Sequence, residues 1–434
     1  MRGVLIEARR TPLRWVSVLL AGVLVAFMLV NRADWSQVWQ RASAAIDTPV
    51  FYVGPILAGA QAARVGAIAR QGVGEVVDAG TRPSWAVALT QMVAGALWAL
   101  VPVVFGVLTA GAVMVGSSAP GFVDLGYVLL AVLGLWWCVG VGQLLGSMGG
   151  PLWFAPIAAA MVCLFRFGIP YGNGYGSGGL DRVVAGAPSY LEINWIALGA
   201  VVLELLALGV LAVAVPWMWG RVRLGKDVRH WPGGAGRALT ASACTCIVVV
   251  SVVATAASPS LTRERSAPSS SACAGSAITA CVWPQDSAYL PMMSNVLMRA
   301  TTDVAPFGFV VAGRTSEVGL SDDDTFTLVG SGEWTFAEGV ADHIMGETYP
   351  LSETCDIPES GAQVDQFHVD YFEVSAWIAL RLHGAPRPAD INDTSTTDWS
   401  SLEDLVEADV ADQSAWLAPR MDRLRQTTDA WCTR

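Results

Sequence analysis

Apolar and polar positions divide the chain into two unlike parts. Up to residue 257, seven apolar runs alternate with short polar or charged stretches. Most runs approach the roughly 20 residues that an α-helix needs to cross the hydrocarbon core of a bilayer. The pattern therefore predicts seven membrane-spanning helices, at about residues 15–31, 49–63, 85–115, 126–145, 151–169, 195–218 and 238–257.

Basic residues at the ends of these runs predict how the helices are oriented. Arginines crowd residues 1–14, and the two most basic loops cover residues 64–82 and 221–237. Because Lys and Arg concentrate in cytoplasmic loops, we expect the N-terminus inside and everything after the seventh run outside. A cleavable signal peptide is the alternative for the first run. Residues 31–35 offer no small-x-small cleavage site, so we favour a retained span.

The second part of the chain is polar. Residues 258–271 are rich in Ser, Pro and Ala and predict a flexible linker. Residues 272–434 are numerous enough to form their own core. Apolar residues spaced by three and four predict helices, and residues 307–312 and 325–329 are strand-like. The expected fold is an α-helical membrane bundle, with a six-span core and a seventh span, followed by a mostly helical α+β domain outside the membrane.

Composition agrees with a membrane protein. The chain is 53% hydrophobic and 15% charged, with a mean hydropathy of +0.47, whereas soluble proteins are about 25% charged. Residues 1–257 carry 16 basic and 10 acidic side chains, and residues 258–434 carry 10 and 27, a net charge of −17 for this second part. An acidic domain repels phosphates, so nucleic acid is excluded as a partner and the lipid bilayer is the expected environment.

The eight cysteines fall into two groups of four. Within the apolar runs a free thiol behaves as a small apolar group, and this group comprises Cys138, Cys163, Cys244 and Cys246. The other four lie in the domain expected outside, where disulfides form: Cys273, Cys281, Cys355 and Cys432. Three pairings are possible, and we favour Cys273–Cys281 with Cys355–Cys432 because cysteines close in sequence readily close a short loop. Four free thiols are the alternative.

Known catalytic motifs are missing from the sequence. Its one lysine, Lys226, is followed by Asp227 rather than the Ser or Thr of a phosphate-binding loop, so ATP would have to be bound by a partner subunit and no cofactor is expected. No His-Glu-x-x-His occurs, and Ser287 and Ser375 lack nucleophile-elbow glycines. His343 and Glu347 lie one helical turn apart and could hold a metal weakly, but a solvated helix face is the simpler interpretation. We expect neither an enzyme nor a metal site.

One acidic residue lies near the middle of a predicted span. Glu204 is about ten residues from the start of the sixth run, and Arg166 near the end of the fifth run is a possible partner. A carboxyl group at that depth is costly unless it faces a cavity or a partner. The two residues are therefore candidates for a substrate path, with a structural polar contact or a protonated Glu204 as the alternative.

The stretch between the second and third runs is charged and punctuated by glycines. Its apolar residues recur at spacings near three and four, which suits a helix lying flat under the membrane. Such a surface suits a cytoplasmic partner. The candidate docking residues are Arg64, Arg70, Glu75, Arg82 and Pro83.

These features give the chain a family resemblance. With its basic N-terminal lead, its second span, and the turn from Arg70 to Pro83 before the third span, the membrane part resembles permease subunits of type-2 ABC exporters. In that family the corresponding charged stretch docks on the ATPase. The domain after the linker is similar to domains appended to actinobacterial ABC permeases of the lantibiotic-transport type, through residues 281–284 (Cys-Val-Trp-Pro) and 317–320 (Glu-Val-Gly-Leu). The seventh span departs from the family pattern.

The resemblance implies a non-catalytic permease subunit in the plasma membrane. It would export a peptide or another small amphipathic substrate, paired with a second permease copy or homologue and powered by a separate cytoplasmic ABC ATPase. The alternative is a membrane-anchored receptor or peptide-binding module outside the membrane, without transport activity. Co-purification of a nucleotide-binding subunit would separate the two hypotheses.

Overall fold

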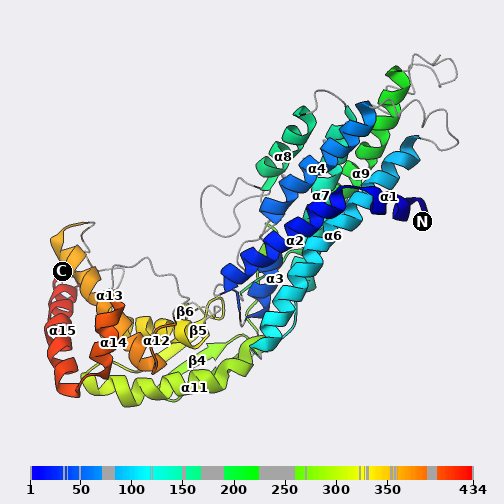
Figure 1. Ribbon diagram of the computed structural model, residues 1–434. Helices are drawn as coiled ribbons and strands as arrows, with labels where there is room; N and C mark the ends of the chain where they lie inside the picture. Colours follow the sequence, from blue (N-terminus) through cyan, green and yellow to red (C-terminus); the bar gives the residue numbers. More distant parts are fainter. Residues whose placement is uncertain are drawn as a thin grey trace.

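The computed structural model contains a bundle of long helices and a mixed α+β region at one end of that bundle (Figure 1). The two parts correspond to the apolar and polar parts of the sequence. The structure describes residues 2–32, 35–36, 38–47, 50–70, 84–117, 119, 121–148, 153–167, 190–223, 260–268, 271–321, 324–326, 328, 332–351, 355, 358, 360–388 and 398–432.

The helices of the bundle follow the apolar runs. Two short helices, α1 (Arg2–Arg10) and α3 (Trp39–Asp47), accompany six longer ones: α2 (Leu13–Val30), α4 (Val50–Arg70), α6 (Ser84–Gly116), α7 (Leu125–Met148), α8 (Phe154–Phe167) and α9 (Trp195–Arg223). Among the described residues, four helices are long and apolar enough to cross a membrane: α2, α6, α7 and α9. The chain is therefore a multi-pass membrane protein. The predicted second and fifth spans are helices α4 and α8, which are not among these four, and the predicted seventh span lies outside the described residues.

Helix α7 lies at the centre of the bundle. In its apolar stretch 61% of the residues are buried, against 28–33% in α2, α6 and α9. It runs parallel to α4, and two glycines one turn apart, Gly142 and Gly146, face the backbone of Ala58 and Ala62. Small residues at this spacing let two helix backbones come close, which is how membrane helices commonly associate.

The α+β region contains a four-stranded sheet in the order β3 (Ala272–Ala274), β4 (Ile278–Val282), β5 (Gly313–Glu317) and β6 (Asp324–Phe326). β3 and β4 are antiparallel, and β4, β5 and β6 are parallel. The strand predicted over residues 307–312 begins later, at Gly313, because a 3-10 turn (η5, Ala305–Phe307) ends at Gly308 with a positive φ of 92°. The other elements are the 3-10 helix η3 (Pro284–Tyr289), α11 (Leu290–Arg299), the π-helical turn η4 (Ala300–Val304), α12 (Glu333–Thr348), α13 (Ala362–His383), α14 (Trp399–Glu407) and α15 (Val410–Cys432).

A two-stranded ribbon joins the two parts of the molecule. β1 (Leu191–Ile193), directly before α9, pairs with β2 (Thr262–Glu264). β2 lies in the stretch predicted to be a flexible linker, and that prediction is wrong for these residues. The reason is a tertiary contact. Leu261 is buried against the bundle with Tyr127 of α7, and this fixes the strand that follows. Because β2 lies beside the start of α9, the chain is found again at residue 260 near the opposite end of that helix from Arg223.

Candidate functional site

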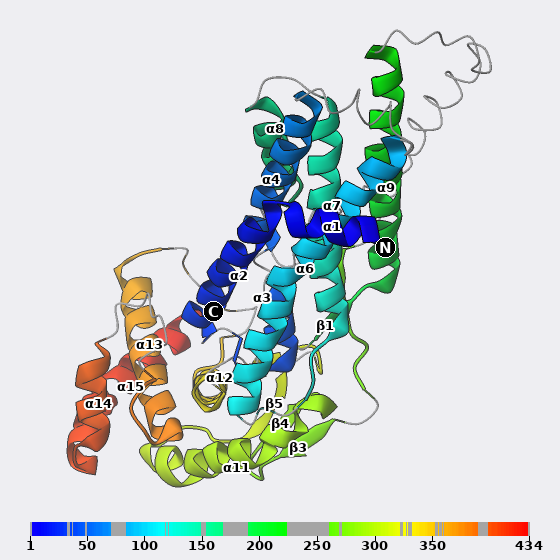
Figure 2. The same cartoon turned by 45° about the vertical axis from the view of Figure 1, so that its right-hand side comes forward.

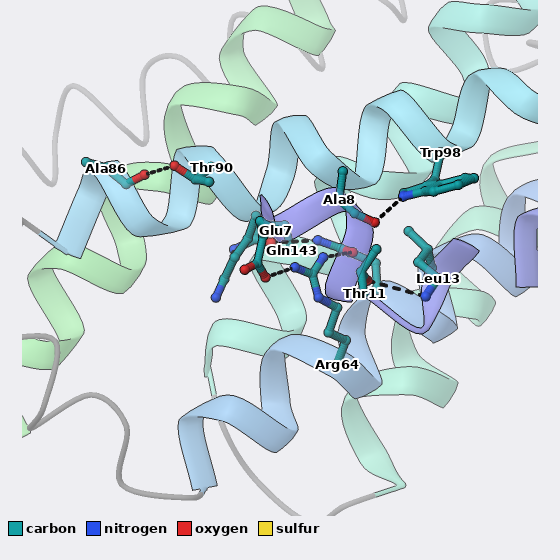
Figure 3. Close-up of polar contacts among 11 residues, drawn as sticks. Glu7, Ala8, Thr11, Leu13, Arg64, Ala86, Thr90, Trp98 and Gln143 are labelled. Carbon is teal, nitrogen blue, oxygen red and sulfur yellow. Dashed lines mark hydrogen bonds and ion pairs between the residues drawn. The ribbon is translucent and has the colours of Figure 1, made fainter. Parts of the chain in front are cut away.

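A buried arginine marks the end of the bundle that is distant from the α+β region. Arg64, in the last two turns of α4, is only 8% exposed. Its guanidinium forms an ion pair with Glu7 of α1 and donates a hydrogen bond of 3.4 Å to Oε1 of Gln61 (Figure 3). A buried charge is tolerated when it is both paired and hydrogen-bonded, and here both conditions are met.

Three glutamines carry this polar contact through the bundle. Gln61 of α4 donates to Oε1 of Gln143 of α7 at 2.7 Å, and Gln143 donates to Oε1 of Gln91 of α6 at 3.4 Å. All three side chains are buried. Because an amide both donates and accepts, the three form a continuous chain in which each bond supports the next. We call the five residues from Glu7 to Gln91 the polar chain. It connects α1, α4, α7 and α6.

Helix α1 is fixed to the bundle at a second point. Trp98 of α6 donates its indole N–H to the backbone oxygen of Ala8 at 2.7 Å. α1 crosses α6 at a steep angle (Figure 2), with Leu5 and Ile6 exposed and arginines in its last turn. Apolar side chains beside basic ones are typical of a helix at a membrane surface.

Of the five predicted docking residues, Arg64 is the one whose side chain the structure describes. Residues 64–70 are not the start of a separate helix but continue α4, because Glu7 compensates the charge of Arg64 and the residues around it favour helix. Arg64 therefore points into the bundle rather than toward a partner. Arg70 is the last residue of α4, and its side chain is not among those that the structure describes. Glu75, Arg82 and Pro83 lie outside the described residues altogether.

Glu204 has a partner that the sequence analysis missed. Trp137 of α7 donates its indole N–H to Oε1 of Glu204 on α9 at 3.0 Å. Arg166, the expected partner, lies on α8, and the structure does not describe its side chain. The paired tryptophans 136 and 137 within an apolar run are the signal that could have suggested an indole donor at this depth.

An apolar groove lies between α6, α7 and α9, with a volume of about 690 Å³. Its walls include Leu89, Met92, Trp136, Leu205 and Val210, and glycines of α7 and α9 form part of its floor. Trp136 donates its indole N–H to the backbone oxygen of Ala96 at 3.1 Å, so the ring presents only apolar surface. The groove can hold hydrocarbon, and none of the described residues that line it is charged.

The two short motifs that carry the family resemblance meet where the α+β region contacts the residues that flank β1 and β2. We call this contact the joint. The backbone N–H of Trp283 donates to Oε2 of the buried Glu317 at 3.1 Å, and its indole N–H donates to the backbone oxygen of Val318 at 3.1 Å. Arg265, which follows β2, lies over the indole ring at 4.6 Å. Gly319 has a φ of +87°, and a Cβ there would be 2.3 Å from Cβ of Tyr190, directly before β1. The motifs therefore hold the α+β region against the ribbon that joins it to the bundle.

The structure pairs the cysteines as the sequence favours. Cys273 is bonded to Cys281, its cross-strand neighbour, and Cys355 is bonded to Cys432 at the end of α15. Cys138 and Cys163 are free and buried in the bundle. Within the described residues no group of three or more metal-binding side chains occurs, and Nε2 of His343 lies 3.1 Å from the backbone oxygen of Ala312.

Comparison with protein-family models, with curated proteins and with solved structures finds no match to this chain. The argument for function therefore depends on the chain's own residues. They show a multi-pass membrane protein with a C-terminal α+β region stabilised by disulfides.

Proposed function

We propose that the chain is the permease subunit of an ABC-type exporter that moves a peptide or another small amphipathic substrate. A separate cytoplasmic ATPase drives it, and a second permease copy or homologue completes the pathway. The observation that carries the proposal is the polar chain, because it joins the end of α4 to α1, α6 and α7 where the charged segment begins.

In this proposal the ATPase docks on the charged segment after α4, through Arg70, Glu75, Arg82 and Pro83. A force on that segment acts directly on the last turns of α4. Since Gln61 and Arg64 bind side chains on two other helices, α7 and α1, α4 cannot move without moving its neighbours or breaking buried hydrogen bonds. Breaking such bonds inside a membrane costs about 1 kcal/mol each, so concerted movement is favoured.

The proposed topology has six crossings and a seventh. Helices α2, α4, α6, α7, α8 and α9 supply the six, and the return of the chain from the end of α9 to β2 supports a crossing by residues 238–257. With the N-terminus inside, the α+β region is outside the cell membrane, where its disulfides are stable. The apolar groove and the nearby Glu204 supply a candidate path for an amphipathic substrate, with Arg166 as a second candidate.

A receptor without transport activity is the second candidate function. It is favoured by the joint, where Arg265 lies over the ring of Trp283 and Gly319 lies against Tyr190, because these contacts between the α+β region and the ribbon would relay a binding event. A receptor of this kind needs no ATPase.

Co-purification tests the proposal. Full-length tagged protein, solubilised from its native membrane, should bring down an ATP-hydrolysing subunit. Reversing two charges in the docking segment, Arg70→Glu with Glu75→Arg, should abolish that association while membrane insertion is kept. Reversing the exposed Arg425 of α15 is the matched control and should change nothing. If the native protein brings down no ATPase, the proposal is wrong and the receptor hypothesis gains support.

A further inference from the structure

A second groove, in the α+β region, lies between the end of α12 and the first half of α13. Its volume is about 480 Å³, and its walls are largely aromatic: Tyr349, Phe367, His368, Tyr371 and Phe372, with Leu351 at one side. Tyr349 and Phe367 are buried and form the floor. Rings at the floor and at the rim give a site shaped for a bulky apolar group.

The rim of this groove exposes apolar side chains. Phe372 is 59% exposed and Leu351 39%. Folding does not require this exposure, because the core of the α+β region is built from other residues, such as Trp334 and Trp377. A concave site with exposed aromatic and aliphatic residues on its rim is typical of an interaction surface.

An acidic side chain flanks the groove on α13. Asp365, His368 and Phe372 are spaced by three and four and so share one face of α13. Among the described residues, Asp365 takes part in no ion pair. Glu347 of α12 follows the lining residue Gly346 but places its carboxylate near Gly313 of β5 instead.

Nearby charges do not cancel this acidity. Asp422 and Arg425 of α15 both act on the hydroxyl of Tyr349, with opposite signs. Burial is the main reason that the pKa of Tyr349 and of Tyr371 is raised to about 12, so both phenols are neutral near pH 7. The wider region is acidic as well, with a net charge of −17 over residues 258–434.

We propose that this groove binds one bulky apolar side chain of a cationic amphipathic peptide, with Asp365 and the net negative charge of the region attracting the basic residues beside it. The proposal rests on the proposed function, because it assigns the peptide substrate of the exporter to a particular site. Phe372 is the expected anchor of the contact, since large aromatic side chains at the centre of an interface carry most of its free energy.

Charge favours this occupant over two others. The headgroups of anionic lipids would be repelled by Asp365 and by the net negative charge of the region, so insertion into such a membrane is disfavoured. A second copy of the chain would bring the same acidic rim to the contact, and like charges across an interface cost several kcal/mol. A cationic partner is instead attracted by the same negative charges.

The experiment uses the full-length protein in nanodiscs of zwitterionic lipid and a fluorescent synthetic peptide of lysine and leucine with one tryptophan. Its counterpart with glutamate in place of lysine is the charge control, and empty nanodiscs measure binding to lipid alone. We expect the lysine peptide to bind the protein, and Phe372→Ala to weaken the binding about tenfold or more. Asp365→Asn should reduce both the affinity and its salt dependence. Met298→Ala, which truncates an exposed apolar residue of α11, is the matched control and should bind like the native protein.

Three results would overturn the proposal: equal binding by Phe372→Ala and Met298→Ala, equal binding of the two peptides, or a signal no greater than that of empty nanodiscs. Because no ATPase is present, the outcome is independent of the co-purification test. Peptide binding without an ATPase partner would support the groove and refute the exporter. An ATPase partner without peptide binding would do the reverse.

Discussion

The closest approach between α4 and α7 offers a sharp test of the bundle. A Cβ placed on Gly142 would be 2.4 Å from the backbone oxygen of Ala58 and 2.9 Å from Cβ of Gln61. An ordinary carbon–oxygen contact is about 3.3 Å, so the two helices would have to separate by about 1 Å. The first contact atom belongs to the backbone, and a rotamer change cannot relieve it.

The expected free energy follows from three contributions. Overpacking a close contact costs about 1–3 kcal/mol. Separating the helices also stretches the 2.7 Å hydrogen bond between Gln61 and Gln143, a further loss of about 1 kcal/mol. Replacing glycine by alanine inside a helix returns up to about 1 kcal/mol. Gly142→Ala should therefore destabilise the bundle by about 2 kcal/mol.

The assay is reversible unfolding of the purified protein in mixed micelles, titrated with a denaturing detergent. Gly22→Ala in α2 and Gly111→Ala in α6 are matched controls, because a Cβ at either position meets no atom within 4 Å. Both should be neutral or slightly more stable than the native protein. If Gly142→Ala unfolds at the same detergent fraction as these controls, the helices are not packed as closely as the structure shows.

Three further substitutions test the other contacts. Arg64→Met should lower the stability of the bundle by about 1–3 kcal/mol in the same unfolding assay, toward the low end because the carboxylate of Glu7 is one-third exposed and can be solvated. Cys432→Ser should cost the α+β region about 2 kcal/mol more in urea than Cys273→Ser, because the two disulfides close loops of 77 and 8 residues. Gly319→Ala should loosen the joint and speed proteolysis between the two halves, because alanine disfavours a φ of +87°.

Each of these predictions has an internal control. Glu7→Gln keeps an acceptor for Arg64 and should cost less than Arg64→Met. Reductant should remove the difference between the two cysteine variants, and a difference that persists would contradict the loop argument. Gly308→Ala also changes a glycine with positive φ, but a Cβ there meets no atom within 4 Å, so it should leave the joint as resistant to protease as in the native protein.

The sequence predicts most of the helices because hydrophobic length is a local property. The runs 85–115 and 126–145 fall within one to three residues of the ends of α6 and α7. The favoured cysteine pairing also agrees with the structure, because one pair needs only a short hairpin between β3 and β4. These features depend on residues near one another in the chain.

The features that the sequence analysis missed depend on distant residues. Arg64 seemed to be a surface residue because its compensating carboxylate, Glu7, is 57 positions away. Leu261 seemed to belong to a flexible linker because its packing partner, Tyr127, is on α7. In both cases the tertiary contact, and not the sequence around the residue, makes it part of an ordered core. The chain of glutamines could not be predicted for the same reason.

Helix α7 connects the two features that the proposed function needs. At one end Gln143 belongs to the polar chain. At the other end Tyr127 packs with Ile193 of β1 and with Leu261 beside β2, so α7 reaches the ribbon that carries the α+β region. A 24-residue helix is about 36 Å long and nearly rigid along its axis. Because α7 is buried on more sides than its neighbours, a displacement at either end is difficult to absorb in between. The bundle therefore supplies one stiff element that could link a docking event at the end of α4 to a binding event in the α+β region.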